Sequence, residues 1–406
     1  MRILVFGPNA GVSISTGGGS NFTLKLARFL VEEGHSVVLA GFHALSLREL
    51  ESLHGIELPG SPGALKLERA PTSDRAYRLS TRSPLRLSPY IALTSPSFDK
   101  WIRRVISARP YELIVFQDDV PRAASAFVRD VSAYLYCHYP FRARKARDLT
   151  SWSLDQSPLA AAGHRVLDLA VARALAPDPG ETVEVTWTNS TMTLRAIQAV
   201  WPRARPVYLP TYVERLSPEP EEVTARTRGS VIALGSIQRS KNYRTLLEAF
   251  RAVSEGPPSR RLTIVGGVRD PLELARLRRT IRRHQLGDRV DIVTDADHSA
   301  VRAHLDRSEV IVHAAVAEPF GLALLEGMAH GCAAVCHEGE RSGGWTDILD
   351  RGTYGRGYAS APDLEETLGR ILEDEREIAR LSALALGRAG SFSRARFAEN
   401  LRGYFH

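Results

Sequence analysis

The feature that most constrains the fold is a repeated alternation of short apolar runs with amphipathic helical stretches. Residues 2–6 lead into a glycine-rich loop, residues 22–30 carry apolar side chains at helical spacing, and residues 36–40 form a second apolar run. A strand, a helix and a second strand in this order predict two parallel strands joined by a crossover. Residues 113–116 and 133–136 are two further apolar runs that predict buried strands.

The same alternation begins again in the second half of the chain. Five more runs predict strands there: residues 230–234, 261–265, 290–293, 310–313 and 333–336. Two blocks of this kind, in 406 residues, predict two doubly wound α/β domains. Pro206, Pro210, Pro218 and Pro220 mark a join between 206 and 229. We therefore expect domains at 1–210 and 211–385. A helix interrupted near Gly387 and Gly390 would leave residues 386–406 free to return to the first domain.

Composition excludes several classes of protein. Three cysteines are too few and too scattered for a disulfide framework, and no apolar stretch reaches about 20 residues, the length of a transmembrane helix. The apolar run at residues 3–6 is shorter than the roughly 7–15 residues of a secretory signal, so we expect a cytoplasmic chain. The formal charge of +7 favours an anionic partner, whether nucleic acid, a phosphorylated small molecule or anionic lipid.

The most informative stretch is residues 318–335, which begins Glu-Pro-Phe-Gly and continues with apolar helical spacing. Pro319 disfavours helix at Glu318, so we expect Glu318 in the loop before a helix that begins near Gly321. A helix N-terminus offers unpaired N–H groups, and a glycine there lets a ligand approach the backbone. Glu326 would lie about 8–9 Å further along this helix. Two such carboxylates can hold two parts of one elongated ligand, although isolated glutamates are more often solvated.

Glu318 and Glu326, with an aromatic-glycine pair before the helix and a small-residue turn after it, resemble the signature of retaining GT-B glycosyltransferases of the family 4 type (glycosyl transferases group 1). The resemblance is nearest to mannosyltransferases that build lipid-linked oligosaccharides. It implies an α/β GT-B fold, in which two Rossmann-like doubly wound domains face a central cleft. It also implies that Glu318 lies near the donor sugar, that Glu326 holds the ribose, and that Phe320, Gly321 and Leu322 reach sugar and phosphate.

A second element, residues 235–242, follows the predicted strand 230–234 and also resembles this family. Family members place an arginine directly after the glycine and a lysine five residues later, both on the diphosphate. Lys241 fits, and a lysine there would stabilise the leaving diphosphate; otherwise it is a solvated loop lysine. Ser236 stands in the arginine position, so either Arg239 replaces the missing guanidinium or the arginine is absent.

The first domain offers weaker matches. Gly18 and Gly19 resemble the family's Gly-Gly loop, which contacts the diphosphate through N–H groups, although a glycine triplet equally suits a flexible loop. His138 resembles the histidine that contacts the donor sugar, since imidazole can donate to a sugar hydroxyl; a histidine at a strand end is otherwise structural. Residues 342–348, Ser-Gly-Gly-Trp-Thr-Asp-Ile, resemble a run in the lipid-linked-oligosaccharide mannosyltransferases, but lack its proline.

Positive charge gathers in the first half of the chain. Residues 66–109 hold ten Lys and Arg against three Asp and Glu, mixed with aromatic side chains, and Arg142, Arg144, Lys145 and Arg147 follow His138. This mixture suits an anionic membrane surface or a polyprenyl-phosphate acceptor, or is a solvated arginine-rich surface. No nucleic-acid module is recognised, so no nucleic acid is expected. Cys332 and Cys336 lack a second pair, and we expect no metal.

Together these features predict a retaining hexosyltransferase without metal or other cofactor. Its donor would be a nucleotide diphosphate-sugar, GDP-mannose in the first instance, and its acceptor a lipid-linked or other glycan bound by the first domain. We expect it in the cytoplasm, with a peripheral position on the cytoplasmic membrane face as an option. Two alternatives stay open. One is a GT-B nucleotide-sugar epimerase using Asp118, Asp119 and His138 as acid and base. The other is a non-catalytic lipid- or nucleic-acid-binding protein.

Overall fold

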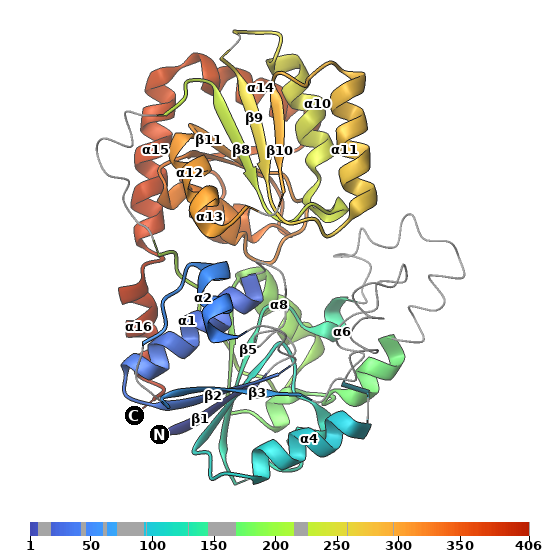
Figure 1. Cartoon of the computed structure of the whole chain (residues 1–406), viewed down its shortest axis with the longest axis vertical. Coiled ribbons are helices and arrows are strands. Elements are labelled where there is room, and N and C mark those ends of the chain that lie inside the picture. Colours follow the sequence, from blue (N-terminus) through green and yellow to red (C-terminus); the bar gives the residue numbers. More distant parts are fainter. Residues whose placement is uncertain are drawn as a thin grey trace. The chain divides into compact units, whose positions relative to one another are not determined.

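The computed structural model describes residues 1–6, 18–41, 46–59, 63–70, 93–94, 96–128, 130–144, 168–214, 226–257, 259–294 and 296–405. The chain divides into two compact units (Figure 1). The first unit consists of Met1–Asn189 with Thr193–Leu209, and the second of Ser190–Met192 with Pro210–His406.

The first unit is built on a sheet whose described strands are all parallel and follow the order β3-β2-β1-β4-β5-β6-β7. This order reverses direction between β1 and β4, and in a doubly wound sheet ligands bind at the carboxyl ends of the strands where the order reverses. The strands are β1 (Arg2–Phe6), β2 (Ser36–Gly41), β3 (Leu65–Arg69), β4 (Leu113–Gln117), β5 (Ser132–Cys137), β6 (Val185–Thr188) and β7 (Pro206–Tyr208).

Helices cover this first sheet, and one face packs on α4. Phe6 of β1 contacts Phe98 and Trp101 of α4 and Phe116 of β4, with ring centroids 5.9–6.0 Å apart. Burying an aromatic side chain in this way stabilises a fold by about 2 kcal/mol or more. The helices are α1 (Gly18–Glu32), α2 (Leu47–His54), α4 (Pro96–Ser107), α5 (Arg122–Ser125), α6 (Phe141–Arg144), the 3₁₀ turn η2 (Pro179–Glu181) and α8 (Thr191–Val200).

The second unit repeats the same design. Its described strands are again all parallel, in the order β10-β9-β8-β11-β12-β13, so the order reverses between β8 and β11. The strands are β8 (Ser230–Leu234), β9 (Arg261–Val265), β10 (Val290–Val293), β11 (Val310–His313), β12 (Ala333–His337) and β13 (Arg356–Tyr358). The helices are η3 (Arg239–Lys241), α10 (Tyr243–Val253), α11 (Pro271–Arg283), α12 (His298–Arg307), α13 (Leu322–Ala329), the π-helical turn η4 (Gly344–Ile348), α14 (Ala361–Glu373), α15 (Glu375–Gly390) and α16 (Arg394–Arg402).

Alternate residues of the second sheet enter two separate cores. Val310 and Val312 of β11 pack with residues of α10, α11 and α14, whereas Ile311 packs with residues of α12, α13 and α15. Figure 1 shows α10 and α11 on one side of this sheet and α13 and α15 on the other. Because both faces are buried, the strands are continuous apolar runs, which is the pattern that made them predictable.

The strand predictions agree with the structure to within one residue at each end, but four strands were missed. The missed strands are β3, β6, β7 and β13, and β3, β7 and β13 lie at sheet edges. Strand β7 begins at Pro206, inside the stretch interpreted as a linker; proline is tolerated on an edge strand because one side needs no N–H donor. Helix α1 begins at Gly18 and not at residue 22.

The interruption predicted near Gly387 and Gly390 occurs in the structure directly after Gly390. Helix α15 runs through Gly387 to Gly390, and the chain leaves helix only at Ser391 before Ser393 caps α16. A Cβ added at either glycine would meet nothing within 4 Å, so both glycines lie on an open helix surface. The return of residues 386–406 to the first domain stays a prediction.

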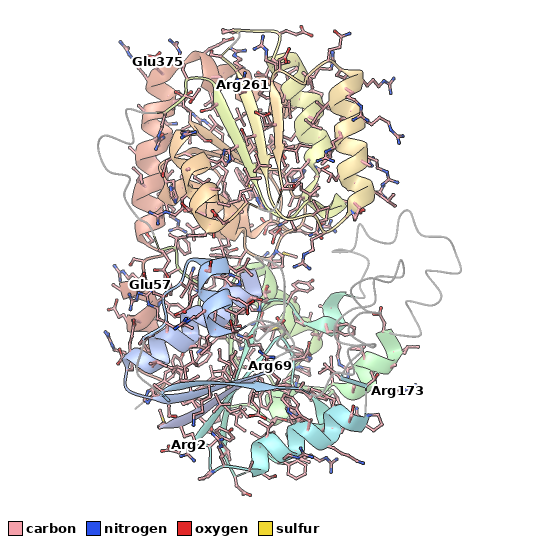
Figure 2. All side chains as sticks on the ribbon, viewed as in Figure 1. Arg2, Glu57, Arg69, Arg173, Arg261 and Glu375 are labelled. Atoms are coloured by element: carbon pink, nitrogen blue, oxygen red, sulfur yellow. The ribbon has the colours of Figure 1, made fainter. Side chains whose placement is uncertain are left out.

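Charged side chains form ion pairs on the surface of each unit. Arg261 and Glu375, labelled in Figure 2, pair with Asp291 at 3.8 Å and with Arg228 at 2.9 Å, and all four side chains are more than half exposed. Exposed pairs of this kind contribute about 0–1 kcal/mol each, so the stability of each unit depends mainly on its buried apolar residues. Within the described parts of the chain, no helix has both the length and the apolar character needed to cross a membrane.

Candidate active site

The loop after β8 is shaped by a glycine and an asparagine. Gly235 has φ 141°, and its carbonyl accepts a hydrogen bond from the Tyr243 hydroxyl at 2.8 Å. The turn η3 ends at Asn242, which has φ 54° and donates from Nδ2 to the carbonyl of Ala314 at 3.2 Å. Ala314 directly follows β11, so Asn242 ties the loop after β8 to the loop after β11. This bond holds Lys241, the residue before Asn242, at the carboxyl edge where the strand order reverses.

The loop after β11 holds Glu318 in extended backbone, as Pro319 predicts. The Glu318 N–H donates to the Arg341 carbonyl at 3.0 Å, and the Glu318 carbonyl accepts from the Gly343 N–H at 2.8 Å. These two bonds fix the loop against residues 341–343. The backbone of Glu318 is therefore held by hydrogen bonds through both its N–H and its carbonyl, and Glu318 does not lie in a freely solvated loop.

Lys241 and Glu318 form an ion pair through Nζ and Oε2, although 77 residues separate them in sequence. Their side chains are only 15% and 25% exposed, so solvent screens the pair weakly. Burial by itself would raise the pKa of Glu318, but the Lys241 ammonium, His313 and the hydrogen bond from Lys241 outweigh burial and hold that pKa below its ordinary value. The site thus keeps an ionised carboxylate beside an ammonium.

A buried histidine lies within electrostatic range of this pair, and sequence reasoning missed it. His313, the last residue of β11, is 4% exposed, and its Nε2 has no hydrogen-bond partner among the described residues. Burial, and then the Lys241 charge, lower the pKa of His313 to about 4, with Glu318 acting in the opposite direction. The imidazole is therefore neutral at pH 7. The signal available in the sequence was a histidine at the carboxyl end of an apolar strand next to the signature.

The Ser-Gly-Gly run at residues 342–344 has a steric explanation. A Cβ on Gly343 would lie 2.1 Å from the Pro319 carbonyl oxygen, and a Cβ on Gly344 would lie 2.9 Å from the Cys336 sulfur. The run therefore packs its backbone directly on the Glu318 loop. Asp347 of the same segment accepts hydrogen bonds from the backbone N–H and the hydroxyl of Thr191, at 2.8 and 3.0 Å; both residues are grouped with the second unit.

Helix α13 begins at Leu322, one residue later than expected. Gly321 stands at its N-cap with φ 101° and gives no side-chain cap, and the helical N–H groups of Leu324 and Leu325 are the first that bond to the Gly321 carbonyl. The N–H groups of Leu322 and Ala323 thus lie before the first hydrogen bond of the helix, at the end that carries the partial positive charge of the helix dipole. This end of α13 directly follows Glu318.

The remaining residues of the signature divide between core and surface. The Phe320 side chain is 5% exposed and packs against Phe392 with ring centroids 5.9 Å apart, so only its backbone can serve a ligand. Glu326 lies half-buried on α13. Gly327 is required for packing, because a Cβ there would lie 2.3 Å from Ile311. Arg239 lies half-buried in η3, two residues before Lys241.

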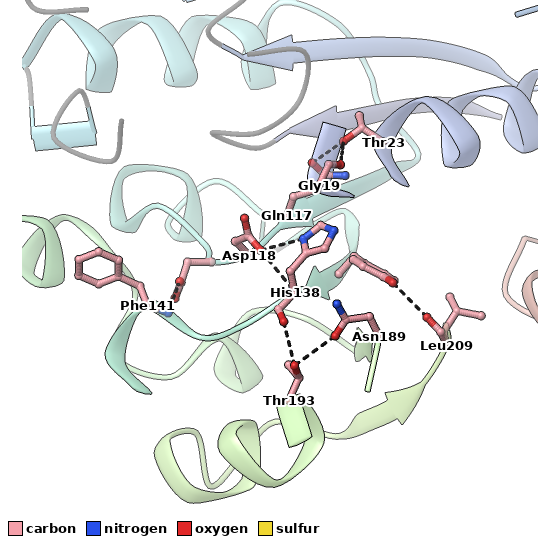
Figure 3. A network of polar contacts seen from close by, with 11 residues as sticks. Gly19, Thr23, Gln117, Asp118, His138, Phe141, Asn189, Thr193 and Leu209 are labelled. Carbon is pink, nitrogen blue, oxygen red and sulfur yellow. Dashed lines mark hydrogen bonds and ion pairs between the residues drawn. The ribbon is translucent and has the colours of Figure 1, made fainter. Parts of the chain in front are cut away.

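In the first unit, His138 lies directly after β5 in a polar network (Figure 3). Oδ1 of Asp118, which directly follows β4, accepts from the His138 N–H at 3.1 Å and lies 2.9 Å from Nδ1 of the ring. The Thr193 hydroxyl donates to the His138 carbonyl at 2.8 Å and lies 3.1 Å from Oδ1 of Asn189. The neighbouring Asp119 instead accepts from the Phe141 N–H at 3.0 Å.

Gly18 and Gly19 open helix α1 and do not lie in a loop. The Gly19 carbonyl accepts from the Thr23 hydroxyl at 3.0 Å, and the same hydroxyl lies 2.8 Å from Oε1 of Gln117, the last residue of β4. The start of α1 thus meets the end of β4 where the first strand order reverses. Of the other predicted features, residues 7–17, 71–92 and 145–167, with about half of the basic aromatic segment 66–109, lie outside the described residues.

No cluster of three or more His, Cys, Asp or Glu side chains suited to a metal occurs among the described residues. Cys332 and Cys336 are buried free thiols, and burial raises the pKa of each to about 12. Asp295 and Asp297 have the spacing Asp-x-Asp, but Asp297 caps α12 by accepting from the Ala300 N–H at 2.7 Å, and Asp295 lies outside the described residues.

Residues 219–385 match the family model "Glycosyl transferases group 1". The chain is also similar to GDP-Man:Man(3)GlcNAc(2)-PP-Dol alpha-1,2-mannosyltransferases. It is 28% identical to that of Neurospora crassa over 320 residues, which cover 66% of this chain and 56% of the relative. It is 27% identical to that of Homo sapiens over 209 residues, which cover 48% and 42%. The chain spans about half the length of these relatives.

Solved structures share the fold at low sequence identity. Sucrose-phosphate synthase from Thermosynechococcus elongatus has a TM-score of 0.73 at 16% identity, covering 100% of this chain and 98% of that chain. WaaG, a glycosyltransferase involved in lipopolysaccharide biosynthesis, has a TM-score of 0.67 at 14% identity, covering 99% and 100%. HepE of Anabaena, in complex with UDP-glucose, has a TM-score of 0.66 at 17% identity, covering 99% and 98%. The chain therefore has a GT-B fold, and residues 219–385 are a glycosyl transferases group 1 domain.

Proposed function

We propose that this chain is a retaining glycosyltransferase that moves a hexose, mannose in the first instance, from a nucleotide diphosphate-sugar to a lipid-linked or other glycan acceptor. The observation that carries the proposal is the Lys241–Glu318 ion pair in a glycosyl transferases group 1 domain, directly before the N-terminus of α13. GDP-mannose and a lipid-linked acceptor are suggested by the names of the curated relatives. The HepE complex with UDP-glucose makes UDP the rival nucleotide.

In this proposal the second unit holds the nucleotide diphosphate. The N–H groups of Leu322 and Ala323 and the Lys241 ammonium supply positive potential for the two phosphates. Arg239, in the same turn as Lys241, is a candidate for the guanidinium that Ser236 does not provide. Glu326 would accept hydrogen bonds from the two ribose hydroxyls. Glu318 would accept from hydroxyls of the sugar, since Lys241 keeps its carboxylate ionised.

The chemical step breaks the bond between the anomeric carbon and the diphosphate oxygen. The electron pair leaves with the diphosphate, and Lys241 with the start of α13 stabilises the charge that develops there. The acceptor hydroxyl attacks the anomeric carbon from the face that the diphosphate leaves, and its proton passes to a diphosphate oxygen. Configuration at the anomeric carbon is thereby retained without a covalent sugar–protein intermediate.

The first unit is assigned the acceptor and part of the donor. His138 would contact the transferred sugar, and the N–H groups of Gly18 and Gly19, at the start of α1, would contact the diphosphate. The proposal uses neither a metal nor another cofactor. An acceptor carrying a lipid would bring the protein to a membrane surface on the cytoplasmic side.

Thermal stabilisation by GDP, UDP and ADP tests the proposal, with wild type and Glu326→Ala compared. A ligand at 100 times its Kd stabilises a protein by about 2.7 kcal/mol, which is readily seen as a rise in Tm. We expect GDP to raise the Tm of the wild type. Glu326→Ala should weaken GDP binding by about 10-fold or more, since a hydrogen bond to a charged group contributes about 1.5–3 kcal/mol.

The matched control is Glu248→Ala, which removes an exposed glutamate from α10 of the same domain and should keep the wild-type shift. A rise in Tm with UDP alone would rule out GDP-mannose as the donor but would still support a glycosyltransferase. A protein that none of the three nucleotides stabilises would refute the proposal and favour a non-catalytic binding protein.

A further inference from the structure

Asp118, which orients His138, has a strained backbone. Its φ is 64°, in the left-handed region that few residues other than glycine, asparagine and aspartate adopt. The next N–H, that of Asp119, donates back to the Gln117 carbonyl at 2.8 Å, which closes a tight turn around Asp118. The side chain is completely buried. Strained, buried polar residues of this kind persist where the surrounding structure holds them, often at functional sites.

The hydrogen bonds of Asp118 determine which ring nitrogen of His138 carries a proton. Oδ1 of Asp118 accepts from the His138 backbone N–H and lies 2.9 Å from Nδ1. An ionised carboxylate only accepts hydrogen bonds, and a neutral imidazole has one N–H. That N–H must therefore be on Nδ1, which leaves the lone pair on Nε2.

Nε2 of His138 is buried and has no hydrogen-bond partner among the described residues. The ring cannot readily turn to find one. It meets the Tyr136 ring at a centroid distance of 4.9 Å and the Phe22 ring at 5.7 Å, both edge to face, and Thr193 holds its backbone carbonyl. A buried polar atom that lacks a partner costs about 1–3 kcal/mol, so this nitrogen suits a donor group on a ligand.

We propose that Asp118 is a positioning residue that fixes His138 in the Nδ1–H tautomer, so that Nε2 accepts a hydrogen bond from one hydroxyl of the donor sugar. The inference rests on the proposed function, and it reverses the direction in which His138 was expected to bond. A hydroxyl can donate to this nitrogen, whereas fluorine or hydrogen at the same carbon cannot. Asp118 thereby makes the site selective for a free hydroxyl at one position of the sugar.

A cycle of donor analogues and variants tests this role. The donors are GDP-mannose and its monodeoxyfluoro analogues, and the variant is Asp118→Asn, because asparagine also tolerates the left-handed backbone. At one position, fluorine should lower kcat/KM of the wild type by about 10- to 100-fold. Asp118→Asn should lower kcat/KM for the parent donor by a similar factor and leave that for the fluoro analogue nearly unchanged. If Asp118 had a purely structural role, Asp118→Asn would lower kcat/KM for both donors by the same factor, and this result would overturn the proposal. It would also be overturned if fluorine at no position of the sugar lowered kcat/KM of the wild type.

The tautomer itself can be read in the free protein by ¹H–¹⁵N correlation spectra of the histidine rings, with His138 assigned from the His138→Gln variant. We expect Nδ1–H in the wild type and predominantly Nε2–H in Asp118→Asn, because the asparagine amide can donate to Nδ1. The matched control is Asp178→Asn, since Asp178 is a buried carboxylate of the same unit that accepts from the Gly180 and Arg203 N–H groups. Nε2–H in the wild type refutes the role of Asp118 even if nucleotides bind, whereas absent nucleotide binding refutes the proposed function alone.

Discussion

Replacing His313 by glutamine should remove much of the acid sensitivity of the second unit. His313 is 4% exposed at the end of β11, and burial lowers its pKa to about 4 from 6.5. The unfolded chain therefore binds the proton more readily than the folded chain. Stability that depends on a neutral His313 is complete above pH 6.5 and is lost as the pH falls toward 4.

The size of this loss follows from the two pKa values. A difference between 6.5 and about 4 corresponds to about 3 kcal/mol over the whole range. Between pH 7 and pH 5, the populations of protonated His313 in the two states give a loss of about 2 kcal/mol. Glu318 contributes little in this interval, because its ordinary pKa of 4.5 and its lower pKa in the folded chain both lie below pH 5. His35 and His337, whose pKa values burial also lowers, occur in both proteins and cancel in the comparison.

Urea unfolding followed by tryptophan fluorescence at pH 7 and pH 5 measures the effect. The wild type should lose about 2 kcal/mol more than His313→Gln between the two pH values, whatever the stability of the variant at pH 7. His284→Gln, which removes an exposed histidine after α11, should behave as the wild type does. An equal loss in the wild type and in His313→Gln would show that His313 is not held neutral by burial.

Two further predictions address the pair and its supporting loop. Lys241→Ala should lower turnover by about 10²-fold or more in a transfer assay, as loss of a charge-stabilising donor does, and wild-type turnover would rule out its assigned role. Gly343→Ala should destabilise the second unit in thermal unfolding, because the new Cβ would lie 2.1 Å from the Pro319 carbonyl. The matched change Gly387→Ala, on the open surface of α15, should instead stabilise by about 0.5–1 kcal/mol; a Gly343→Ala protein as stable as the wild type would refute the packing argument.

The sequence predicted all of the internal strands except β6 and missed three of the four at the edges, β3, β7 and β13. Strands such as β8, β9 and β11 are continuous apolar runs, because helices cover both sides of the sheet. Strands β3 and β13 carry charged residues and lie at edges, so their strand conformation depends on one neighbour more than on their own composition. Helix α1 was placed four residues late because glycines 18 and 19 favour a loop on propensity, which tertiary contacts override.

The spacing of Glu318 and Glu326, together with the aromatic-glycine pair before the helix and the small-residue turn after it, pointed to the family, and Pro319 predicted the extended backbone at Glu318. Spacing along one segment cannot show which distant residues meet it. The pairing of Lys241 with Glu318 depends on β8 and β11 being neighbours in the sheet, which brings both following loops to one edge. The need for glycine at 343, the burial of His313 and the left-handed backbone of Asp118 likewise arise from contacts between segments. Local sequence determines the elements and their order, whereas burial, charge and tautomer at the site depend on what the completed sheets place around each side chain.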